Sequence, residues 1–310
     1  TTSGTASATI SQRPVNVTAV TDTKIYDGSN SSDELPVVGN LQTGDLVTSV
    51  GTQLFDNANA GTSKVLTPSV TVISDGNSGA NYAISYVTSS TGVITAKELT
   101  VSNAAVTTKI YDGNTTAAVS GATLSGIVGS DDVVLENKTS GTLASASVGT
   151  HSVTTTPMTI SGTKAANYSL TQPILSGEVT AKPITGNFTA DNKVYDRNVT
   201  ATVLTRSLNG VVPIDAGQVS LTGGTATFAD SNVAIGITVT SSGMTLAGDK
   251  AGNYSLTSVG TTTATITRLT ITGNFTVTAS KEYDQNTSAN VLTRTLSGVL
   301  GTDDVTLTGG

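Results

Sequence analysis

The stretch Lys24-Ile25-Tyr26-Asp27 decides the fold, because the chain repeats it as Lys109-Ile110-Tyr111-Asp112, Lys193-Val194-Tyr195-Asp196 and Lys281-Glu282-Tyr283-Asp284. A second element, Asn followed by Tyr, comes late in each of the first three rounds, at Asn81-Tyr82, Asn167-Tyr168 and Asn253-Tyr254. Both elements recur with a period of about 85 residues. Self-similarity at a fixed period indicates an array of like modules. The function of such an array is more often reach, multiplicity or display than a single reaction centre.

The period divides the chain of 310 residues into three whole modules and a fragment at each end. We expect modules at 14–97, 98–182 and 183–267, with residues 1–13 as the tail of a preceding repeat and 268–310 as the first half of a further repeat. A module this small buries roughly 60 to 65% of its unfolded surface, so it is expected to depend partly on its neighbours. No flexible Gly/Ser spacer separates the modules, which predicts end-to-end stacking with little freedom between them.

Apolar residues come in short alternating runs, such as Val70-Thr71-Val72-Ile73, and turn signals such as Asp27-Gly28 and Gly223-Gly224 follow at close intervals. This pattern is typical of short β-strands, and no window of a dozen residues carries an apolar stripe at helical spacing. We therefore predict an all-β fold, a tandem array of small antiparallel β-sandwich (Ig-like) modules stacked end to end. A β-grasp-like module is the alternative.

Composition excludes several classes of function. With 36% hydrophobic and 12% charged residues, the chain is too apolar and too weakly charged for a disordered tail. Its net charge is −7, and no cluster of Lys and Arg marks a surface for nucleic acid or anionic membrane. No apolar run approaches the roughly 18 residues that a membrane helix needs. We expect no nucleic-acid partner and no membrane insertion.

Reactive residue types are scarce. The chain has no cysteine, hence no disulfide and no thiolate metal site, and its one histidine, His151, occurs in a single module. Paired acids at Asp131-Asp132 and Asp303-Asp304 resemble calcium ligands only weakly, because no further oxygen donors follow at the spacing of a calcium loop. We expect turn acids in contact with water there, no cofactor, and no enzyme activity.

The YD element is interpreted as a tight turn, in which the carboxylate of Asp27, Asp112, Asp196 or Asp284 accepts backbone N–H groups. The next residue is Gly28 or Gly113 in two repeats and Arg197 or Gln285 in the others. Since Arg and Gln are accepted there, we expect the left-handed conformation at the following asparagine, which is Asn114, Asn198 or Asn286. Such turn chemistry leaves no need for a catalytic aspartate.

Seven of the eight tyrosines belong to the YD or NY elements, namely Tyr26, Tyr82, Tyr111, Tyr168, Tyr195, Tyr254 and Tyr283. The chain has no tryptophan, and these rings recur at matching places in the modules. We expect core anchors whose hydroxyls find a hydrogen-bond partner, rather than an exposed stripe for stacking sugars.

A more speculative interpretation pairs Lys24 with Asn81, Lys109 with Asn167 and Lys193 with Asn253 in intramolecular isopeptide bonds, promoted by a nearby buried acid. Lys lies two residues before Tyr and therefore on the same strand face, so that an inward tyrosine would draw the lysine inward too. Against the crosslink, a lysine near a strand end usually extends its amine to water.

The KxYDG stretch at Lys24 and Lys109, its variants at Lys193 and Lys281, and the later NY element resemble the YDG-type repeats of large bacterial surface and secreted adhesins, including filamentous-haemagglutinin-like proteins. The resemblance covers nearly the whole chain, although Arg197 and Gln285 replace the glycine. It implies a repetitive extracellular β-module of an adhesin, and it carries over no catalytic or binding residue.

These observations together predict a non-enzymatic stalk on the bacterial cell surface, secreted or associated with the outer membrane, that projects an adhesive domain from the cell. Its expected partners are neighbouring repeats of the same long chain and a ligand on a host or neighbouring cell. One alternative is an array of weak binding modules for a host glycan or protein that acts by avidity. Another is self-assembly into a matrix or fibre.

Overall fold

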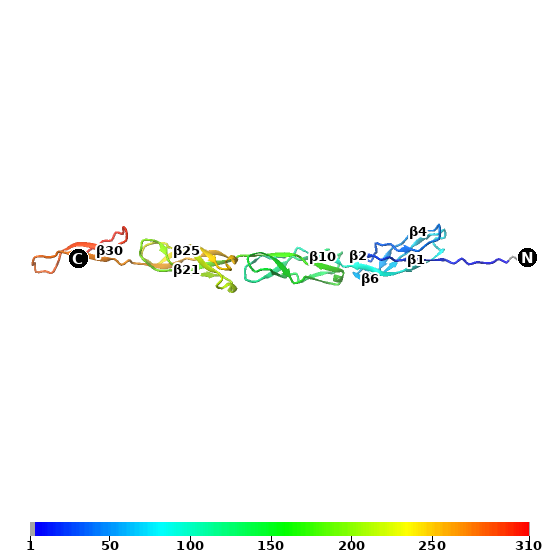
Figure 1. The fold of residues 1–310 in the computed structure, drawn as a ribbon, viewed down its shortest axis with the longest axis horizontal. Helices are drawn as coiled ribbons and strands as arrows, with labels where there is room; N and C mark the ends of the chain where they lie inside the picture. Colours follow the sequence, from blue (N-terminus) through cyan, green and yellow to red (C-terminus); the bar gives the residue numbers. More distant parts are fainter. Residues whose placement is uncertain (1–3, 310) are drawn as a thin grey trace. The chain divides into compact units, whose positions relative to one another are not determined.

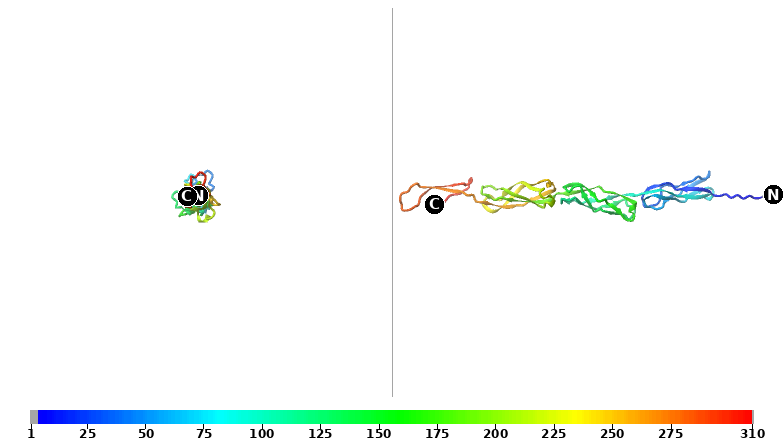
Figure 2. Two further views of the ribbon diagram at one scale, coloured as in Figure 1. Left: turned by 90° about the vertical axis from the view of Figure 1, so that its left-hand side faces the viewer. Right: turned by 60° about the horizontal axis from the view of Figure 1, so that its bottom comes forward.

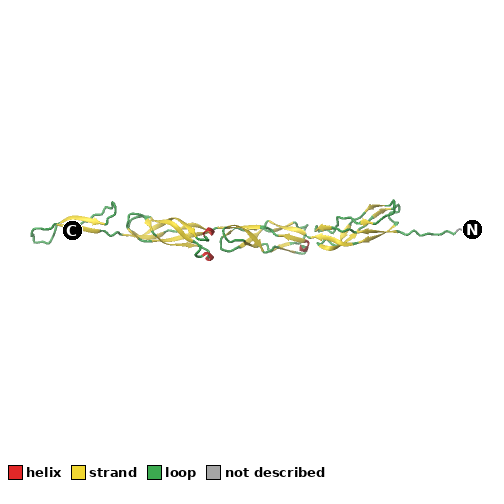
Figure 3. Cartoon of the chain, viewed as in Figure 1, coloured by secondary structure: helices red, strands yellow, loops and turns green. Residues whose placement is uncertain are grey.

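The computed structural model describes residues 4–309, in which strands and turns predominate (Figure 3). The predicted tail 1–13 therefore lies partly outside the described residues. Helical structure in the described part is confined to single 3₁₀ turns, η1 (Ala165–Asn167), η2 (Pro213–Asp215) and η3 (Ala251–Asn253). In residues 4–309 no helix is long and apolar enough to cross a membrane. The predicted all-β fold in tandem modules is confirmed.

The chain divides into two compact units. Unit 1 comprises Thr1–Thr107, Thr115–Ala144 and Thr150–Glu178, and unit 2 comprises Thr108–Asn114, Ser145–Gly149 and Val179–Gly310. Unit 1 therefore holds repeat 1 and most of repeat 2. Unit 2 holds repeat 3 and the residues after it, together with the YD turn of repeat 2 and its loop at 145–149.

Repeat 1, coloured blue to cyan in Figures 1 and 2, forms its own bundle of strands in unit 1. Its strands are β1 (Arg13–Thr18), β2 (Thr23–Ile25), β3 (Val37–Val38), β4 (Leu46–Ser49), β5 (Gln53–Phe55), β6 (Gly61–Pro68), β7 (Val72–Ser74), β8 (Tyr82–Val87) and β9 (Ser89–Thr95). They form sheets in the orders β3-β1-β8, β2-β9-β6-β5 and β4-β7.

Repeat 2 follows the same plan. Its strands are β10 (Lys97–Ser102), β11 (Ala105–Val106), β12 (Lys109–Ile110), β13 (Thr116–Ser120), β14 (Thr123–Ser125), β15 (Val134–Glu136), β16 (Ser140–Leu143), β17 (Gly149–Thr155), β18 (Thr159–Ser161), β19 (Tyr168–Thr171) and β20 (Leu175–Thr180). In unit 1 the sheet orders are β14-β10-β19, β11-β13-β16-β17-β20 and β15-β18, and in unit 2 β12 pairs with the end of β20.

Unit 2 contains repeat 3 and the hairpin after it. The strands are β21 (Lys182–Ala190), β22 (Lys193–Val194), β23 (Thr200–Ala201), β24 (Val203–Asn209), β25 (Ser220–Phe228), β26 (Ala234–Ala247), β27 (Tyr254–Val259), β28 (Thr262–Thr267), β29 (Thr272–Val277) and β30 (Val291–Ser297). The sheet orders are β24-β21-β27, β22-β28-β26-β25-β23 and β29-β30.

Two parallel pairs recur in the repeats. The first strand pairs with the NY strand, with Arg13 opposite Tyr82, Lys97 opposite Tyr168 and Lys182 opposite Tyr254. The YD strand pairs with the closing strand, with Lys24 opposite Ile94, Lys109 opposite Val179 and Lys193 opposite Ile266. The sheets are therefore mixed, whereas the sequence predicted antiparallel ones. Parallel neighbours need a long crossover, and here the intervening strands of the module supply it.

Side chains along the longer strands alternate between buried and exposed, so that one face of the strand packs on a core. In unit 1 the side chains of Phe55, Leu66 and Ile94 lie in one buried cluster. In unit 2 Val239 and Ile266 lie in the corresponding cluster. Burying a side chain of this kind stabilises the fold by about 1.5–3 kcal/mol relative to leaving it exposed. The period-2 pattern of the sequence is thus what holds each module together.

Candidate functional site

Each YD turn is closed by an ion pair between its lysine and its aspartate. Lys24 Nζ lies 2.9 Å from Asp27 Oδ1, and the matching distances at Lys109, Lys193 and Lys281 are 2.8, 2.6 and 3.0 Å. Asp27 Oδ1 also accepts the N–H of Ser29 at 2.8 Å, and the other three aspartates accept an N–H in the same way. Although burial alone would raise the pKa of Asp27, the hydrogen bonds from Lys24 and Ser29 hold it below its ordinary value.

The left-handed conformation falls one residue earlier than the sequence predicted. The residue directly after the aspartate has φ of +83° at Gly28, +82° at Gly113, +68° at Arg197 and +65° at Gln285. The expectation at Asn114, Asn198 and Asn286 was therefore wrong. Because Arg and Gln hold a conformation that favours glycine, the turn accepts a strained backbone there. The ion pair and the aspartate hydrogen bond fix the turn on either side of this residue.

The YD tyrosine of repeat 1 reaches the next repeat within unit 1. Its hydroxyl donates to Asp131 Oδ2 at 2.8 Å, and Tyr168 donates to the same oxygen at 2.6 Å. The Val128 N–H in turn donates to the Tyr168 hydroxyl at 3.0 Å. The rings of Tyr26 and Tyr168 meet edge to face, with centroids 5.3 Å apart at 76°. We call this arrangement a junction. The name turn aspartates is kept for Asp131 and the residues at the same place in the other repeats, Asp45, Asp215 and Asp303, and does not include the aspartates of the YD turns.

A second tie crosses the same junction. The side chain of Asn167, next to the NY tyrosine, accepts the N–H of Ala60 from repeat 1 at 2.9 Å. Asn167 is 3% exposed, so its amide is buried at the contact. The Gly28 position adds close packing, since a Cβ placed there would lie 3.2 Å from Val128 Cγ1. The junction thus joins the YD turn and the loop around Ala60 to Asp131 and Asn167 of repeat 2.

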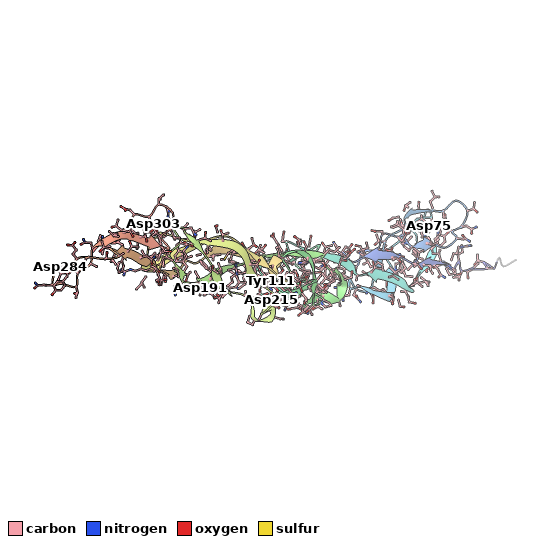
Figure 4. All side chains as sticks on the ribbon, turned by 60° about the vertical axis from the view of Figure 1, so that its left-hand side comes forward. Asp75, Tyr111, Asp191, Asp215, Asp284 and Asp303 are labelled. Atoms are coloured by element: carbon pink, nitrogen blue, oxygen red, sulfur yellow. The ribbon has the colours of Figure 1, made fainter. Side chains whose placement is uncertain are left out.

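Unit 2 contains the same junction between the YD turn of repeat 2 and repeat 3 (Figure 4). Asp215 Oδ2 accepts Tyr111 at 2.8 Å and Tyr254 at 2.6 Å, and the two rings meet edge to face at 5.4 Å and 78°. The Val212 N–H donates to the Tyr254 hydroxyl at 3.1 Å. Asn253 accepts the N–H of Val148 at 3.0 Å, as Asn167 accepts that of Ala60.

A variant of the junction follows repeat 3. Tyr195 reaches Asp303 Oδ1 at 3.4 Å, a longer contact than in the two earlier junctions. Arg197, which replaces the glycine of the turn, places Nε 3.3 Å from the same oxygen and donates to the carbonyl of Leu300 and the hydroxyl of Thr302. The guanidinium group thus binds the turn aspartate from the position where the turns of repeats 1 and 2 carry Gly28 and Gly113.

The junction favours neutral phenols beside an ionised carboxylate. Burial, followed by the hydrogen bond to the turn aspartate, raises the pKa of Tyr26 and of Tyr111 to about 12. The same causes raise the pKa of Tyr168 and Tyr254. Hydrogen bonds from Tyr168 and then Tyr26 hold the pKa of Asp131 below its ordinary value of 3.8.

Lysines and asparagines of the proposed crosslinks have other partners. In unit 1, Lys24 Nζ donates to the carbonyl of Ser31 at 2.9 Å in addition to its ion pair, and lies 5.9 Å from the centre of the Phe55 ring. Asn81 donates to the carbonyl of Asp75 at 3.3 Å. In unit 2, Lys193 donates to the carbonyl of Asn198 at 2.7 Å, whereas Asn253 accepts the Val148 N–H. These contacts give the lysines and the asparagines separate structural roles.

Sequence reasoning missed the turn aspartates as a set. Asp131 and Asp303 were considered there only as weak calcium ligands, and Asp45 and Asp215 were overlooked. The available signal was their spacing, because Asp45, Asp131, Asp215 and Asp303 recur with the period of the repeat. Each also donates its N–H to the carbonyl of the residue three positions earlier, so the four turns share one shape.

A family model described as the YDG domain matches residues 11–90, 95–174 and 180–265. The chain belongs to the YDG-domain family. The three tandem matches fall on the three whole repeats, so the predicted resemblance to YDG repeats is confirmed.

A comparison with solved structures found two with weak similarity. Drosophila N-cadherin EC1–3 has 6% identity and a TM-score of 0.21, over 82% of this chain and 100% of that chain. The I9–I11 tandem from titin has 10% identity and a TM-score of 0.18, over 83% and 97%. Scores this low carry no argument about fold or function. A search of the curated proteins found no match.

Removing the Tyr26 hydroxyl should weaken unit 1. We expect Tyr26→Phe to lower its free energy of unfolding by about 1–2 kcal/mol, since a hydrogen bond to a carboxylate is lost while the ring stays. The control is Tyr86→Phe, because Tyr86 is 43% exposed, belongs to neither element, and its hydroxyl accepts only a long bond of 3.3 Å from the Thr71 N–H, with no carboxylate partner. Urea denaturation of both variants, of Asp131→Ala and of Tyr26→Phe/Asp131→Ala gives a double-mutant cycle with an expected coupling above about 0.5 kcal/mol. Equal effects of the two Tyr→Phe changes would show that the junction bond contributes nothing.

Alkaline pH should destabilise the junctions. An unfolded tyrosine loses its proton near pH 10, whereas Tyr26 and Tyr111 hold theirs to about 12. Their contribution to the free energy of unfolding is therefore complete below pH 10 and is lost as the pH rises through 12. Denaturation midpoints measured from pH 8 to 12 should fall over this window, and fall less in Tyr26→Phe/Tyr111→Phe. Identical slopes in the two proteins would contradict this assignment.

Proposed function

We propose that this chain is a non-enzymatic stalk segment of a bacterial cell-surface adhesin, whose YDG repeats hold an adhesive domain away from the cell. The protein is then extracellular, either secreted or associated with the outer membrane, and its nearest partners are neighbouring repeats of the same chain. The observation that carries the proposal is the junction, in which the motif that defines the repeat binds the next repeat. A module that uses its signature residues to bind its neighbour is suited to serial assembly.

A spacer needs connections that resist bending, and the first junction has three features of this kind. The connection itself is short, because β9 ends at Thr95 and β10 begins at Lys97. The Tyr26 hydroxyl and the Ala60 N–H then bind repeat 2 at separate points, Asp131 and Asn167. Two contacts beside a covalent connection restrain rotation about it, which a single flexible linker would allow.

The strand order suits a chain under tension. The YD strand β2 and the closing strand β9 pair in parallel, with Thr23 opposite Val93 and Ile25 opposite Thr95. β22 and β28 pair in the same way in unit 2. Tension enters a repeat at its first strand, whose parallel neighbour is the NY strand, and leaves at the closing strand, whose parallel neighbour is the YD strand, so it loads both parallel pairs along their strands. Hydrogen bonds loaded in this direction share the load instead of opening one at a time.

Small-angle scattering tests the stalk. We expect a maximum dimension of about 100 Å or more, against about 50 Å for one compact globule of this length. In Asp131→Ala/Asp215→Ala the distribution of distances should broaden, since two junctions lose the carboxylate that binds both phenols. The matched control is Asp249→Ala, which changes an exposed aspartate outside the junctions. A maximum dimension near that of a globule, in dilute solution, would eliminate the stalk.

A binding array is the second candidate, and one recurring feature favours it. The residue before the YD tyrosine is apolar and exposed in three repeats, by 63% at Ile25, 56% at Ile110 and 51% at Val194. A single exposed apolar side chain is ordinary, but the same address in each repeat is what avidity requires. Binding of the chain to immobilised mammalian glycans should then be lost in Ile25→Thr/Ile110→Thr/Val194→Thr. Binding that persists in this variant, or no binding by the unmodified chain, would remove the candidate.

A further inference from the structure

Asparagine followed by glycine occurs at one place in the sequence, Asn209-Gly210, where β24 ends. Glycine has no side chain, so nothing on it keeps its backbone nitrogen away from the Cγ atom of the asparagine before it. The same turn carries Ser125 in repeat 2 and Ser297 in the hairpin after repeat 3, and glycine follows in both. Repeat 3 therefore departs from the common pattern by the asparagine, at a position where serine also serves.

Neither Asn209 nor Gly210 is restrained by a hydrogen bond at the atoms that could react. Asn209 is exposed, and within residues 4–309 its side-chain amide has no hydrogen-bond partner. The Gly210 N–H also lacks an acceptor in this described part of the chain, whereas Gly39, at the same place in repeat 1, donates to the carbonyl of Asn16 at 2.8 Å. The peptide group between Asn209 and Gly210 can therefore turn without breaking a hydrogen bond of the glycine.

The Asp-Gly pairs of the chain have the same glycine but a side chain that is bound. Asp27 and Asp112 form the ion pairs of their YD turns, at 2.9 and 2.8 Å, and each accepts a backbone N–H as well. Asp75 accepts three backbone N–H groups. Each carboxylate is thus held in its turn, away from the nitrogen of the next residue. Asn209 differs from all three because its side chain is free.

We propose that Asn209 is a site of spontaneous covalent modification, at which its side-chain amide becomes an acid through a cyclic imide formed with Gly210. The Gly210 nitrogen attacks Asn209 Cγ and a C–N bond forms. The bond from Cγ to the side-chain nitrogen breaks, and that nitrogen leaves as ammonia with the proton of the attacking N–H. Water then opens the ring at either carbonyl, so that water is consumed and ammonia released, with no oxidant, metal or enzyme.

The two directions of ring opening give different backbones. Opening at the Cγ carbonyl gives aspartate and restores the ordinary chain. Opening at the backbone carbonyl of residue 209 gives isoaspartate, in which the chain passes through the side chain and is one atom longer. A longer chain matters here, because Gly210 is closely packed: a Cβ placed on it would lie 3.2 Å from Ile184 Cγ2.

The modified turn leads directly into the junction of unit 2. Two residues after Gly210, the Val212 N–H donates to the Tyr254 hydroxyl at 3.1 Å, and the Val212 carbonyl accepts the N–H of Asp215 at 3.0 Å. An extra backbone atom before Gly210 displaces this segment, which carries the acceptor for Tyr111 (Figure 4). Isoaspartate should therefore loosen the junction, whereas aspartate should leave it intact.

The modification makes the junction of unit 2 dependent on the age of the protein. Isoaspartate accumulates with time and is not reversed by the chain itself, so the fraction of loosened junctions rises steadily. Alkaline pH should speed the process, because the attacking nitrogen gives up its proton as the new bond forms. The junction of unit 1 has serine at the corresponding turn, Ser125, and should not age in this way. This inference is independent of the proposed stalk, since it concerns the chemistry of one turn.

Peptide mapping by mass spectrometry tests the modification. The folded chain is incubated at neutral and at mildly alkaline pH, and samples are digested in acid, which does not favour the reaction. We expect the peptide that contains residue 209 to gain the mass of an amide-to-acid exchange, with first-order kinetics and faster at the higher pH. An isoaspartate-specific methyltransferase should label the same peptide. No conversion in the folded chain, over a period in which the chain unfolded in urea converts, would overturn the proposal.

Matched controls separate the free side chain from the effect of glycine alone. Asn209→Ser gives repeat 3 the residue that repeat 2 has at this place and should yield no labelled peptide there. The other asparagines should convert more slowly than Asn209, since none of them precedes glycine. Isoaspartate at Asp27 or Asp112 in the same yield as at residue 209 would contradict the role assigned to the free side chain.

Hydrogen exchange tests the effect on the junction. In aged chains enriched in isoaspartate, the amides of residues 211–218 should exchange faster than in fresh chains. Asn209→Asp supplies the aspartate product directly and should exchange like the fresh chain, which separates the longer backbone from the added charge. Equal exchange in aged, fresh and Asn209→Asp chains would show that the junction does not respond to the modification.

Discussion

The carboxylate of the turn aspartate is the group on which each complete junction depends, because a phenol from its own repeat and a phenol from the preceding repeat donate to the same oxygen. In unit 1 that oxygen is Asp131 Oδ2, and in unit 2 it is Asp215 Oδ2. A carboxylate that receives two hydroxyls is compensated for the water it loses, and a hydrogen bond to a charged group is stronger than one between neutral groups. Removing the acid would leave both phenols at the contact without their shared acceptor. The shared carboxylate therefore joins a tyrosine of one repeat to a tyrosine of the next.

The residue after the YD aspartate adapts the junction to the next repeat. Gly28 and Gly113 allow close approach, since a Cβ at Gly113 would lie 2.9 Å from Ile214 Cγ2. Arg197 accepts a strained backbone at the same position and sends its guanidinium to Asp303. Close packing at the glycine and an ion pair from the arginine are thus two alternative ways to strengthen the contact that the tyrosine makes with the next repeat. The cost of a positive φ for a residue other than glycine, on the order of 1 kcal/mol, is offset where the side chain binds the turn aspartate.

Much of this organisation follows from the sequence, and some of it does not. Strand alternation and the recurrence of Tyr26 and Tyr82 in later repeats predict tandem all-β modules, because burial every second residue is a local property. The sequence gives no local sign that β1 runs parallel to β8, since pairing sense depends on how distant strands meet. The role of Asp131 was hidden for the same reason: its partner Tyr26 lies in another repeat. The left-handed position was misassigned because Arg197 looked incompatible with it, and the compensating contact with Asp303 is also distant in sequence.

Near-identical acceptors raise the question of what keeps the order of repeats correct. A YD turn has the same chemistry in each repeat, so the contact itself discriminates little between its natural neighbour and another copy. Covalent connection supplies the discrimination, because a neighbour joined by one or two residues is present at an effective concentration of about millimolar or higher. An acceptor with a tethered neighbour is therefore saturated even when the contact is weak. Weak junction chemistry combined with short connections keeps the array in register and limits the mispairing to which similar repeats are prone.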